Sequence, residues 1–341
     1  MARSRLDLLV PALFAALPWP PSEAPRAPSL ERMLGRGDRV TAAGADPVST
    51  LFGRFGISAG PEQDLPSAPF SLLADSPETD LAGFWLHADP VHLRADQDRL
   101  RLFDSRPLGI GREEADALVA LFNTHFRAEG LMLEAPEPGR WYLQVAGRRG
   151  IKTQPLHAAV GRSVGSLLPR GPDAGWWNPL LNEVQMLFHQ AEVNRRREEL
   201  GSPLVNGIWV WGGGCLEQTG LRTDLAAVYA DHPLARGLAM AAGADLHPLP
   251  TEGIGDAAEA GHRLVFWDSL WPPALDQDVV TWERELGRLD AWSGTLLSAL
   301  GRRAVAEIYI HPCDGSSFRV TPAAMRRLWR RSLPLFAYRS V

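Results

Sequence analysis

The alternation of apolar and polar residues changes character along the middle of the chain. Arg99–Asp104 alternates with a period of two, which is typical of a half-buried strand. Arg112–Gly130 has apolar residues at helical spacing and a glycine suited to end the helix. Leu131–Glu134 and Trp141–Val145 then predict two strands joined by a proline- and glycine-containing turn. Together these elements predict a compact α+β unit.

The last third of the chain has a different pattern. Three short apolar runs rich in β-branched and aromatic residues predict buried strands at Gly207–Trp211, Leu264–Trp267 and Val305–Ile310. A long amphipathic stretch, Val279–Leu300, lies between the second and third runs. Strand, helix and strand in this order predict a βαβ unit, so we expect a largely parallel sheet with helices on both faces.

Capping residues mark two further helices. Ser29 is suited to be the N-cap of a short helix that Gly35 closes. Asn178 is a good N-cap, and Pro179 is suited to the first helical position after it. We therefore expect one helix to begin after residue 29 and another after residue 178.

The first residues loosely resemble a secretory leader, because an apolar run follows two arginines. Asp7 and Pro11 interrupt this run, and no small-residue cleavage site follows it. We therefore expect a buried strand leading into a loop at this place. No apolar stretch reaches the roughly 18–20 residues of a membrane span, so no membrane association is expected.

Composition narrows the class of protein. The chain has 341 residues, of which 45% are hydrophobic and 22% charged, as in an ordinary globular protein. Its 40 acidic residues outnumber its 35 basic ones, and no long basic run is present, so nucleic acid is not an expected partner. Cys215 and Cys313 fit neither a disulfide framework nor a paired-thiol zinc site, which favours the reducing cytoplasm.

The most distinctive string is VNRRREELGSPLVNGIWVWGGG, from Val193 to Gly214. It predicts a helix end, a turn, a buried strand and a triple-glycine loop. Ligands of open α/β sheets bind beyond the carboxyl ends of strands, and consecutive glycines let backbone N–H groups approach an anion. Gly212–Gly214 are therefore suited to anion binding, although the same glycines also suit a simple turn.

This string resembles a segment of the archaeal-type cofactor-independent phosphoglycerate mutases, which belong to the alkaline phosphatase superfamily. In that segment an Asn-x-x-Arg helix end precedes a glycine, an asparagine and an aliphatic-Trp-aliphatic-Trp-Gly-x-Gly strand and loop. Pro28–Gly37, Glu113–Gly130 and Leu286–Asp290 resemble further family segments in the same order. The chain also resembles a bacterial side branch of this family.

The resemblance implies a fold and a division into domains. The expected fold class is α/β, with an alkaline-phosphatase-like, largely parallel sheet flanked by helices and a smaller inserted α+β lobe. Residues 1–84 and 203–341 would form the core, and residues 85–202 the lobe with its connecting helix.

The resemblance also implies a mechanism in which two divalent metals activate a serine that takes up the phosphoryl group. At the nucleophile's position this chain has Ala45; Asp46 is retained, and Ser49 is a displaced candidate nucleophile. At the segments that should hold the metals, only Asp268, Asp276 and His311 remain as weak candidate ligands. The other histidines are expected in ordinary polar roles, and His232, His247 and His262 are expected in loops.

Losses at every metal segment predict a pseudoenzyme that acts as a regulatory or small-anion-binding module without a cofactor. Its expected ligand is a small phosphorylated or carboxylate anion, and a protein partner is also possible. The residues expected to bind the anion are Asn194, Arg197, Asn206, Gly212, Gly213 and Gly214. The alternative is a metal-dependent phosphoryl-transfer enzyme, a mutase or phosphatase with a rearranged site that uses Mn, Mg or Zn.

Overall fold

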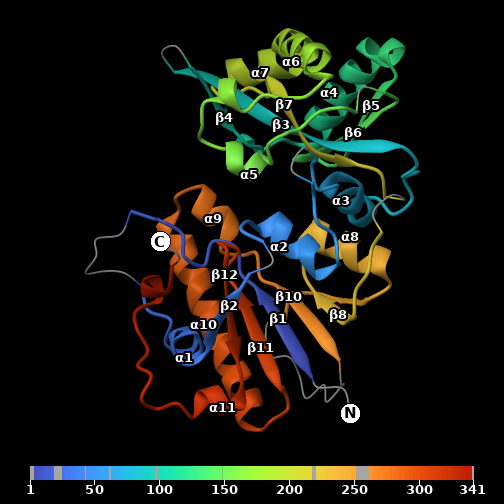
Figure 1. Cartoon of the computed structure of the whole chain (residues 1–341). Helices are drawn as coiled ribbons and strands as arrows, with labels where there is room; N and C mark the ends of the chain where they lie inside the picture. Colours follow the sequence, from blue (N-terminus) through green and yellow to red (C-terminus); the bar gives the residue numbers. More distant parts are fainter. Residues whose placement is uncertain are drawn as a thin grey trace. The chain divides into compact units, whose positions relative to one another are not determined.

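The structure is a computed structural model, and two compact units make up the chain (Figure 1). The core consists of residues 1–58 and 221–341, and the lobe consists of residues 59–220. The described residues are 4–18, 25–42, 44–60, 63–96, 99–147, 149–216, 220–250 and 261–339. The inserted lobe is therefore longer at both ends than the expected 85–202.

The described part of the core contains a seven-stranded sheet. In their spatial order its strands are β2 (Asp38–Thr41), β12 (Ser316–Val320), β11 (Glu307–His311), β1 (Arg5–Leu9), β10 (His262–Phe266), β8 (Leu225–Tyr229) and β9 (Asp245–His247). β1 lies between β10 and β11 and is parallel to both, and β8 and β9 continue the parallel arrangement. Only the pairings of β12 with β11 and β2 are antiparallel among these strands. The expected largely parallel sheet is confirmed.

The two faces of the core sheet differ in polarity because side chains alternate along a strand. Leu6 and Leu8 of β1 and Ile308 of β11 are fully buried in the main apolar cluster. That cluster also holds apolar side chains of α1 and α10, so these helices cover the apolar face. On the other face β1 carries Arg5 and Asp7.

The core helices connect and cover these strands. They are α1 (Pro28–Arg36), α2 (Pro47–Arg54), α8 (Pro233–Ala242), α9 (Trp271–Leu275), α10 (Val279–Gly301) and α11 (Pro322–Met325), with a short 3₁₀ helix at Leu335–Tyr338. The long amphipathic helix between β10 and β11 is α10, as predicted. The first strand, β1, lies where the opening apolar run predicted a buried strand.

The lobe is an antiparallel sheet with helices. Its strands are β3 (Phe84–Asp96), β4 (Arg99–Phe103), β5 (Leu131–Glu137), β6 (Arg140–Val145) and β7 (Gly207–Gly214). Its helices are α3 (Ser67–Asp75), α4 (Arg112–His125), α5 (Leu156–Ala159), α6 (Ala174–His189) and α7 (Glu192–Glu199), with 3₁₀ turns at Arg106–Leu108, Arg127–Glu129 and Val164–Ser166. The predicted α+β elements are present, and Gly130 follows α4 and its 3₁₀ turn in a left-handed conformation, as expected of a helix stop.

The strand predicted at residues 207–211 is present, but it lies in a different sheet from the one expected. We expected this run in the parallel core sheet, but β7 pairs antiparallel with β3 and belongs to the lobe. α3 belongs to the lobe too, since Ala68 and Leu72 pack against Trp85 of β3. An apolar run shows that a strand is buried but does not identify its neighbour. These two elements account for the added length of the lobe.

Two predicted helix starts were also wrong. α1 begins at Pro28 with Ala27 at the N-cap, and Gly37 follows its end. α6 begins at Ala174, so Pro179 lies inside the helix rather than at its first position. The extra turn places Trp177 in the lobe core with no exposed surface. Burying so large an aromatic surface outweighs the backbone hydrogen bond that a proline inside a helix removes.

Within the described residues, no helix combines the length and the apolarity that crossing a membrane requires.

Candidate functional site

The first candidate region lies where β1 and β11 end and α2 begins. Asp46 is the N-cap of α2, and its carboxylate accepts hydrogen bonds from the backbone N–H of Val48 (2.9 Å) and of Ser49 (3.0 Å). The Ser49 hydroxyl donates to the same carboxylate. Asp46 therefore has a complete structural role at the helix terminus. Ala45, at the position aligned with the nucleophile, is exposed and has no side-chain oxygen.

Cys313, which follows β11, lies in the same region and is a strong nucleophile by residue type. Its side chain is 6% exposed, and its thiol lies 3.5 Å from the carbonyl oxygen of His311. Burial raises the pKa of the Cys313 thiol well above its usual range. Since the thiolate is the reactive form, this cysteine is unsuited to nucleophilic attack.

The second candidate region lies at the ends of β8 and β10. Asp268 follows β10 and is partly exposed. Burial, and in addition the charge of Asp231 beyond β8, raises the pKa of the Asp268 carboxyl to about 6. Asp276 is exposed at the C-cap of α9. His311 lies at the end of β11, where its Nδ1 is 2.7 Å from the Ser317 hydroxyl.

The candidate ligands do not form a metal centre. Among the residues that the structure describes, no group of three or more His, Cys, Asp or Glu side chains is arranged so that it could hold a metal ion. The described residues therefore do not fit the two-metal centre that the family resemblance implies, which needs several hard ligands around each cation.

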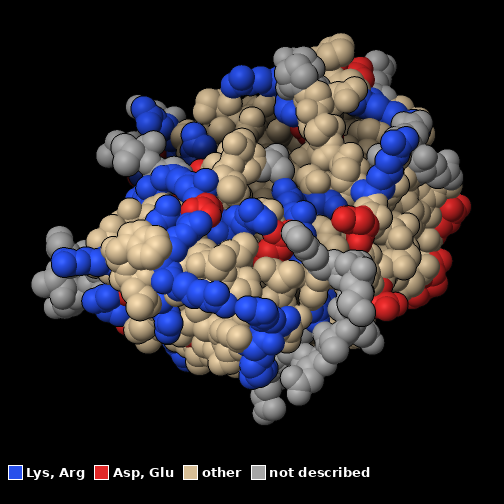
Figure 2. All heavy atoms as spheres, turned by 60° about the horizontal axis from the view of Figure 1, so that its bottom comes forward, with Lys and Arg blue, Asp and Glu red and all other residues tan. Residues whose placement is uncertain are grey.

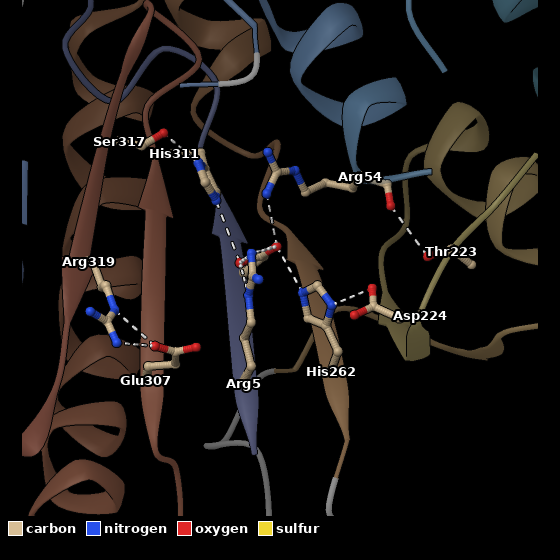
Figure 3. Close-up of polar contacts among 10 residues, drawn as sticks. Arg5, Arg54, Thr223, Asp224, His262, Glu307, His311, Ser317 and Arg319 are labelled. Carbon is tan, nitrogen blue, oxygen red and sulfur yellow. Dashed lines mark hydrogen bonds and ion pairs between the residues drawn. The ribbon is translucent and has the colours of Figure 1, made fainter. Parts of the chain in front are cut away.

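The structure instead reveals a buried polar network in the middle of the core sheet. Figure 3 shows side chains from neighbouring strands and from α2 converging on one carboxylate. The ion pairs identify this carboxylate as that of Asp7. Asp7 has no exposed surface. Its partners are His262 Nε2 at 2.9 Å, Arg54 Nη1 at 3.2 Å, Arg5 Nη2 at 3.1 Å and His311 Nε2 at 3.7 Å.

The surroundings of the two histidines in this network shift their pKa values in opposite directions. Burial alone would raise the pKa of Asp7, but the hydrogen bond and charge of His262, together with the nearby His311 imidazole, outweigh it and hold the pKa well below its usual range. Burial also disfavours protonated His262, yet its bonds to Asp7 and to Asp224 (2.8 Å) raise its pKa. Burial dominates at His311 and lowers its pKa. The network thus favours protonation of His262 and disfavours protonation of His311.

Ser317, His311 and Asp7 follow the order of a nucleophilic triad, but they do not form one. Their residues are 1%, 2% and 0% exposed, so no substrate can reach the hydroxyl in this conformation. The 3.7 Å separation of His311 from Asp7 also exceeds a hydrogen bond. The network therefore connects strands β1, β10, β11 and β12 and carries out no evident chemistry.

In the lobe, the residues of the distinctive string hold elements together. Arg197 is 4% exposed; its Nε and Nη2 donate to Glu114 at 2.8 and 2.6 Å, and its Nη1 donates to the carbonyls of Leu108 and Pro203. An anion could reach this guanidinium only by displacing Glu114. Burial raises the pKa of Glu114, but its bonds to Arg197 and to Gly111 outweigh this effect and lower it.

The two asparagines of the string have similar roles. Asn194 donates to the carbonyls of Phe188 and Val205 and accepts from the backbone N–H of Val205. Asn206 exchanges two hydrogen bonds with the backbone of Leu93 on β3. Both side chains therefore replace backbone partners at a helix end and a strand start, and ligand binding by them stays a prediction.

The triple glycine is part of β7 rather than an open loop, which corrects the sequence interpretation. A Cβ added at Gly212 would lie 2.0 Å from the Ser67 hydroxyl, and one at Gly214 would lie 2.3 Å from the Pro66 side chain. Gly212 also has φ +62°, a conformation that favours glycine. The glycines therefore let β7 pass closely beneath the start of α3. The role of these glycines depends on the close packing of β7 against the start of α3. A run of glycines in the sequence does not predict which segment will pack there.

Sequence reasoning missed Asp7 and placed His262 in a loop, whereas His262 is the first residue of β10. The available signal was a charged residue inside an apolar strand, Arg5-Leu6-Asp7-Leu8-Leu9. Charges are rarely buried without a partner, so this pattern predicts a cationic neighbour. It does not identify that neighbour, because the two strands that flank β1 lie about 250 or more residues further along the chain.

Comparison with known proteins gives a consistent relationship. No family model matches the chain. The chain is 29% identical over 251 residues to the 2,3-bisphosphoglycerate-independent phosphoglycerate mutase of Methanosarcina acetivorans, covering 68% of this chain and 62% of that protein. It is 30% identical over 146 residues to the enzyme of the same name from Methanosarcina mazei, covering 40% of this chain and 36% of that protein. The matches thus span less than two thirds of either relative.

A solved structure of a protein from Pyrococcus horikoshii has a similar fold, with a TM-score of 0.54 and 14% sequence identity. The alignment covers 94% of this chain and 88% of that one. The expected α/β fold, a largely parallel sheet flanked by helices with a smaller inserted lobe, is confirmed. By sequence, this chain is similar to archaeal enzymes named 2,3-bisphosphoglycerate-independent phosphoglycerate mutase.

Proposed function

We propose that this chain is a mutase-like protein that does not transfer phosphoryl groups and acts by binding, as a regulatory or small-anion-binding module. The observation that carries the proposal is the residue at the nucleophile's position, Ala45, which has no oxygen to phosphorylate. The neighbouring carboxylate of Asp46 caps α2. A protein partner, which a regulatory role requires, stays a prediction.

The candidate ligands support the same proposal. His311 is buried against Ser317 and Asp7, Asp276 is exposed at the end of α9, and Asp268 follows β10. Among the described residues, no group of three or more His, Cys, Asp or Glu side chains is arranged so that it could hold a metal ion.

One observation favours the alternative, a metal-dependent phosphoryl-transfer enzyme with a rearranged site. The Ser49 hydroxyl donates to Asp46, which is the relationship of a nucleophile to a base. Ser49 is partly exposed, so a substrate has access to it. In this alternative, the carboxylate of Asp268 would be a ligand of the metal, which would be Mn, Mg or Zn.

A single set of measurements distinguishes the two functions. We expect gently purified protein to hold well under one Mn, Mg or Zn per chain by elemental analysis. We also expect no mutase turnover of 3-phosphoglycerate in a coupled assay with added manganese. Ser49→Ala is the matched variant. Turnover that this variant abolishes, or about two metals per chain, would establish the alternative.

A further inference from the structure

A pocket of about 320 Å³ lies on the core where α1, the end of α10 and α11 meet. None of the candidate residues Ala45, Asp46, Ser49, Asp268, Asp276 and His311 lines it. Its charged lining is Arg32 of α1, Arg303 after α10 and Arg326 at the end of α11. Figure 2 shows Lys and Arg side chains gathered across this end of the core.

These three arginines differ from the arginines around them. Arg36 donates to the Met325 carbonyl, and both Arg327 and Arg330 pair with Asp38. By contrast, none of the three pocket arginines has a side-chain hydrogen bond or an acidic partner among the described residues. The pocket therefore holds three positive charges that the surrounding residues leave uncompensated. The carbonyl end of α10 offsets roughly half of one such charge.

The backbone at Arg303 is a second, independent observation. Arg303 has φ +60°, in the left-handed region that favours glycine. It ends α10 in the usual glycine position, since the N–H of Ala304 donates to the Ala299 carbonyl at 3.0 Å. A strained non-glycine residue is a reason to look for a function of its side chain. Arg303 is one of the residues that line the pocket.

Part of the remaining lining is apolar. Leu297 of α10 and Met325 of α11 are partly buried and contribute to it, beside Ser298 and Pro322. A fully hydrated inorganic ion gains nothing from such a surface, whereas an anion with an apolar body can bury that body and leave its oxygens to the arginines.

We propose that this pocket is a binding site for a small phosphate or carboxylate compound with an apolar body. Its anionic oxygens would accept hydrogen bonds from Arg32, Arg303 and Arg326. The proposal extends the proposed function by locating a ligand site, and it rests on it only in taking the chain to act by binding. Binding is measured independently of metal content and turnover, so either proposal can fail alone.

The test is calorimetric titration of the full chain with phenyl phosphate, benzoate and inorganic phosphate at low salt. We expect phenyl phosphate or benzoate to bind at millimolar concentration or tighter, several-fold more tightly than inorganic phosphate, and to bind more weakly as salt is added. The better of the two aromatic anions identifies phosphate or carboxylate as the preferred group.

Arg303→Gly is the informative variant, because glycine suits the backbone there and the fold is retained while the guanidinium is lost. We expect it to weaken binding about tenfold. Arg331→Gln removes the same charge from a neighbouring exposed position outside the pocket lining and should change binding less than twofold. Arg32→Gln provides a second pocket variant on a different helix.

Three results would overturn the proposal. The first is equal weakening by Arg303→Gly and Arg331→Gln, which would indicate a diffuse field rather than a site. The second is unchanged binding in both pocket variants. The third is no binding of any of the three anions at millimolar concentration.

Discussion

At the scale of single residues, Asp7 shows how a fully buried carboxylate is stabilised. Arg5, Arg54 and His262 surround it, and none of the three is itself fully buried. Their charges are therefore only partly desolvated, which keeps the network's cost low while Asp7 retains its partners.

Asp7→Asn should lower the free energy of unfolding by roughly 2–4 kcal/mol, because it leaves the surrounding cations without their shared anion. It should also lower the pKa of His262, which the bond to Asp7 raises. Asp224→Asn is the matched control, since Asp224 bonds the same imidazole but is 81% exposed; it should cost under about 1 kcal/mol. Urea denaturation and NMR titration of the histidines measure both effects. Equal losses in the two variants would show that burial of Asp7 is unimportant.

Asp89 in the lobe gives a prediction about pH. Burial raises the pKa of this carboxyl to about 7, against the bond that Trp211 Nε1 donates at 2.7 Å. In the unfolded chain the carboxyl loses its proton near pH 4. Between pH 4 and 7 the folded state therefore holds a proton that the unfolded state has released, so this group's contribution to stability falls as pH rises.

Asp89→Asn keeps an acceptor for Trp211 and removes the titration. The free energy of unfolding of the variant minus that of the unmodified chain should increase by up to about 4 kcal/mol between pH 4 and pH 8. This figure follows because the folded and unfolded pKa values of Asp89 differ by roughly three, and each pKa unit corresponds to about 1.4 kcal/mol. Asp96→Asn, on the same strand but 43% exposed and paired with Arg101, should leave the pH dependence unchanged. If the free energies of unfolding of Asp89→Asn and of the unmodified chain changed with pH in the same way, the prediction would be contradicted.

At the scale of elements, helix ends show where a local rule fails. α10 ends with Gly301, Arg302 and Arg303, and the left-handed residue is Arg303 rather than the available glycine. Gly301 lies two positions before the residue that adopts the left-handed conformation, so it does not relieve the backbone strain there. The helix end is therefore stabilised less than its composition suggests.

Arg303→Gly should raise the free energy of unfolding by about 1 kcal/mol, because a left-handed conformation costs a non-glycine residue roughly that much. Arg302→Gly is the control on the adjacent residue, whose φ of −78° any residue adopts; it should lower stability. Thermal and urea unfolding of both variants give the comparison. The prediction fails if the two substitutions shift stability in the same direction.

Periodic elements were predictable because their signals are local. α4 and its following glycine, the β5–β6 hairpin and α10 appeared where spacing and turn residues placed them. The start of α6 and the partner of β7 did not, since the burial of Trp177 and the pairing with β3 involve residues elsewhere in the lobe. Local propensity is a weak prior when tertiary burial opposes it.

At the scale of the whole molecule, the two units differ in how the chain builds them. The lobe is one continuous segment, 59–220, with its own apolar cluster. The core needs both ends of the chain, because β1 lies between β10 and β11. Parallel strands so far apart in sequence cannot pair until most of the chain is made.

A fragment of residues 59–220 should therefore fold alone and unfold cooperatively, whereas a fragment of residues 1–58 should stay unfolded. Tryptophan near-ultraviolet circular dichroism and urea titration measure this. A lobe fragment that keeps helical signal but loses near-ultraviolet signal and cooperativity would show that its core is incomplete by itself.

The sequence by itself determined the α/β class and most helices and strands, since residue types and short-range periodicity carry these. It also supplied the family resemblance that the comparisons support. Only the tertiary structure decided that β7 and α3 join the lobe, that Gly212–Gly214 pack a strand rather than form a loop, and that Arg197 pairs with Glu114. It alone brought Asp7 to His262, and Arg32 to Arg303 and Arg326. The physical reason is common to all of these: each depends on which distant surfaces bury each other, and burial between distant segments leaves no local pattern in the chain.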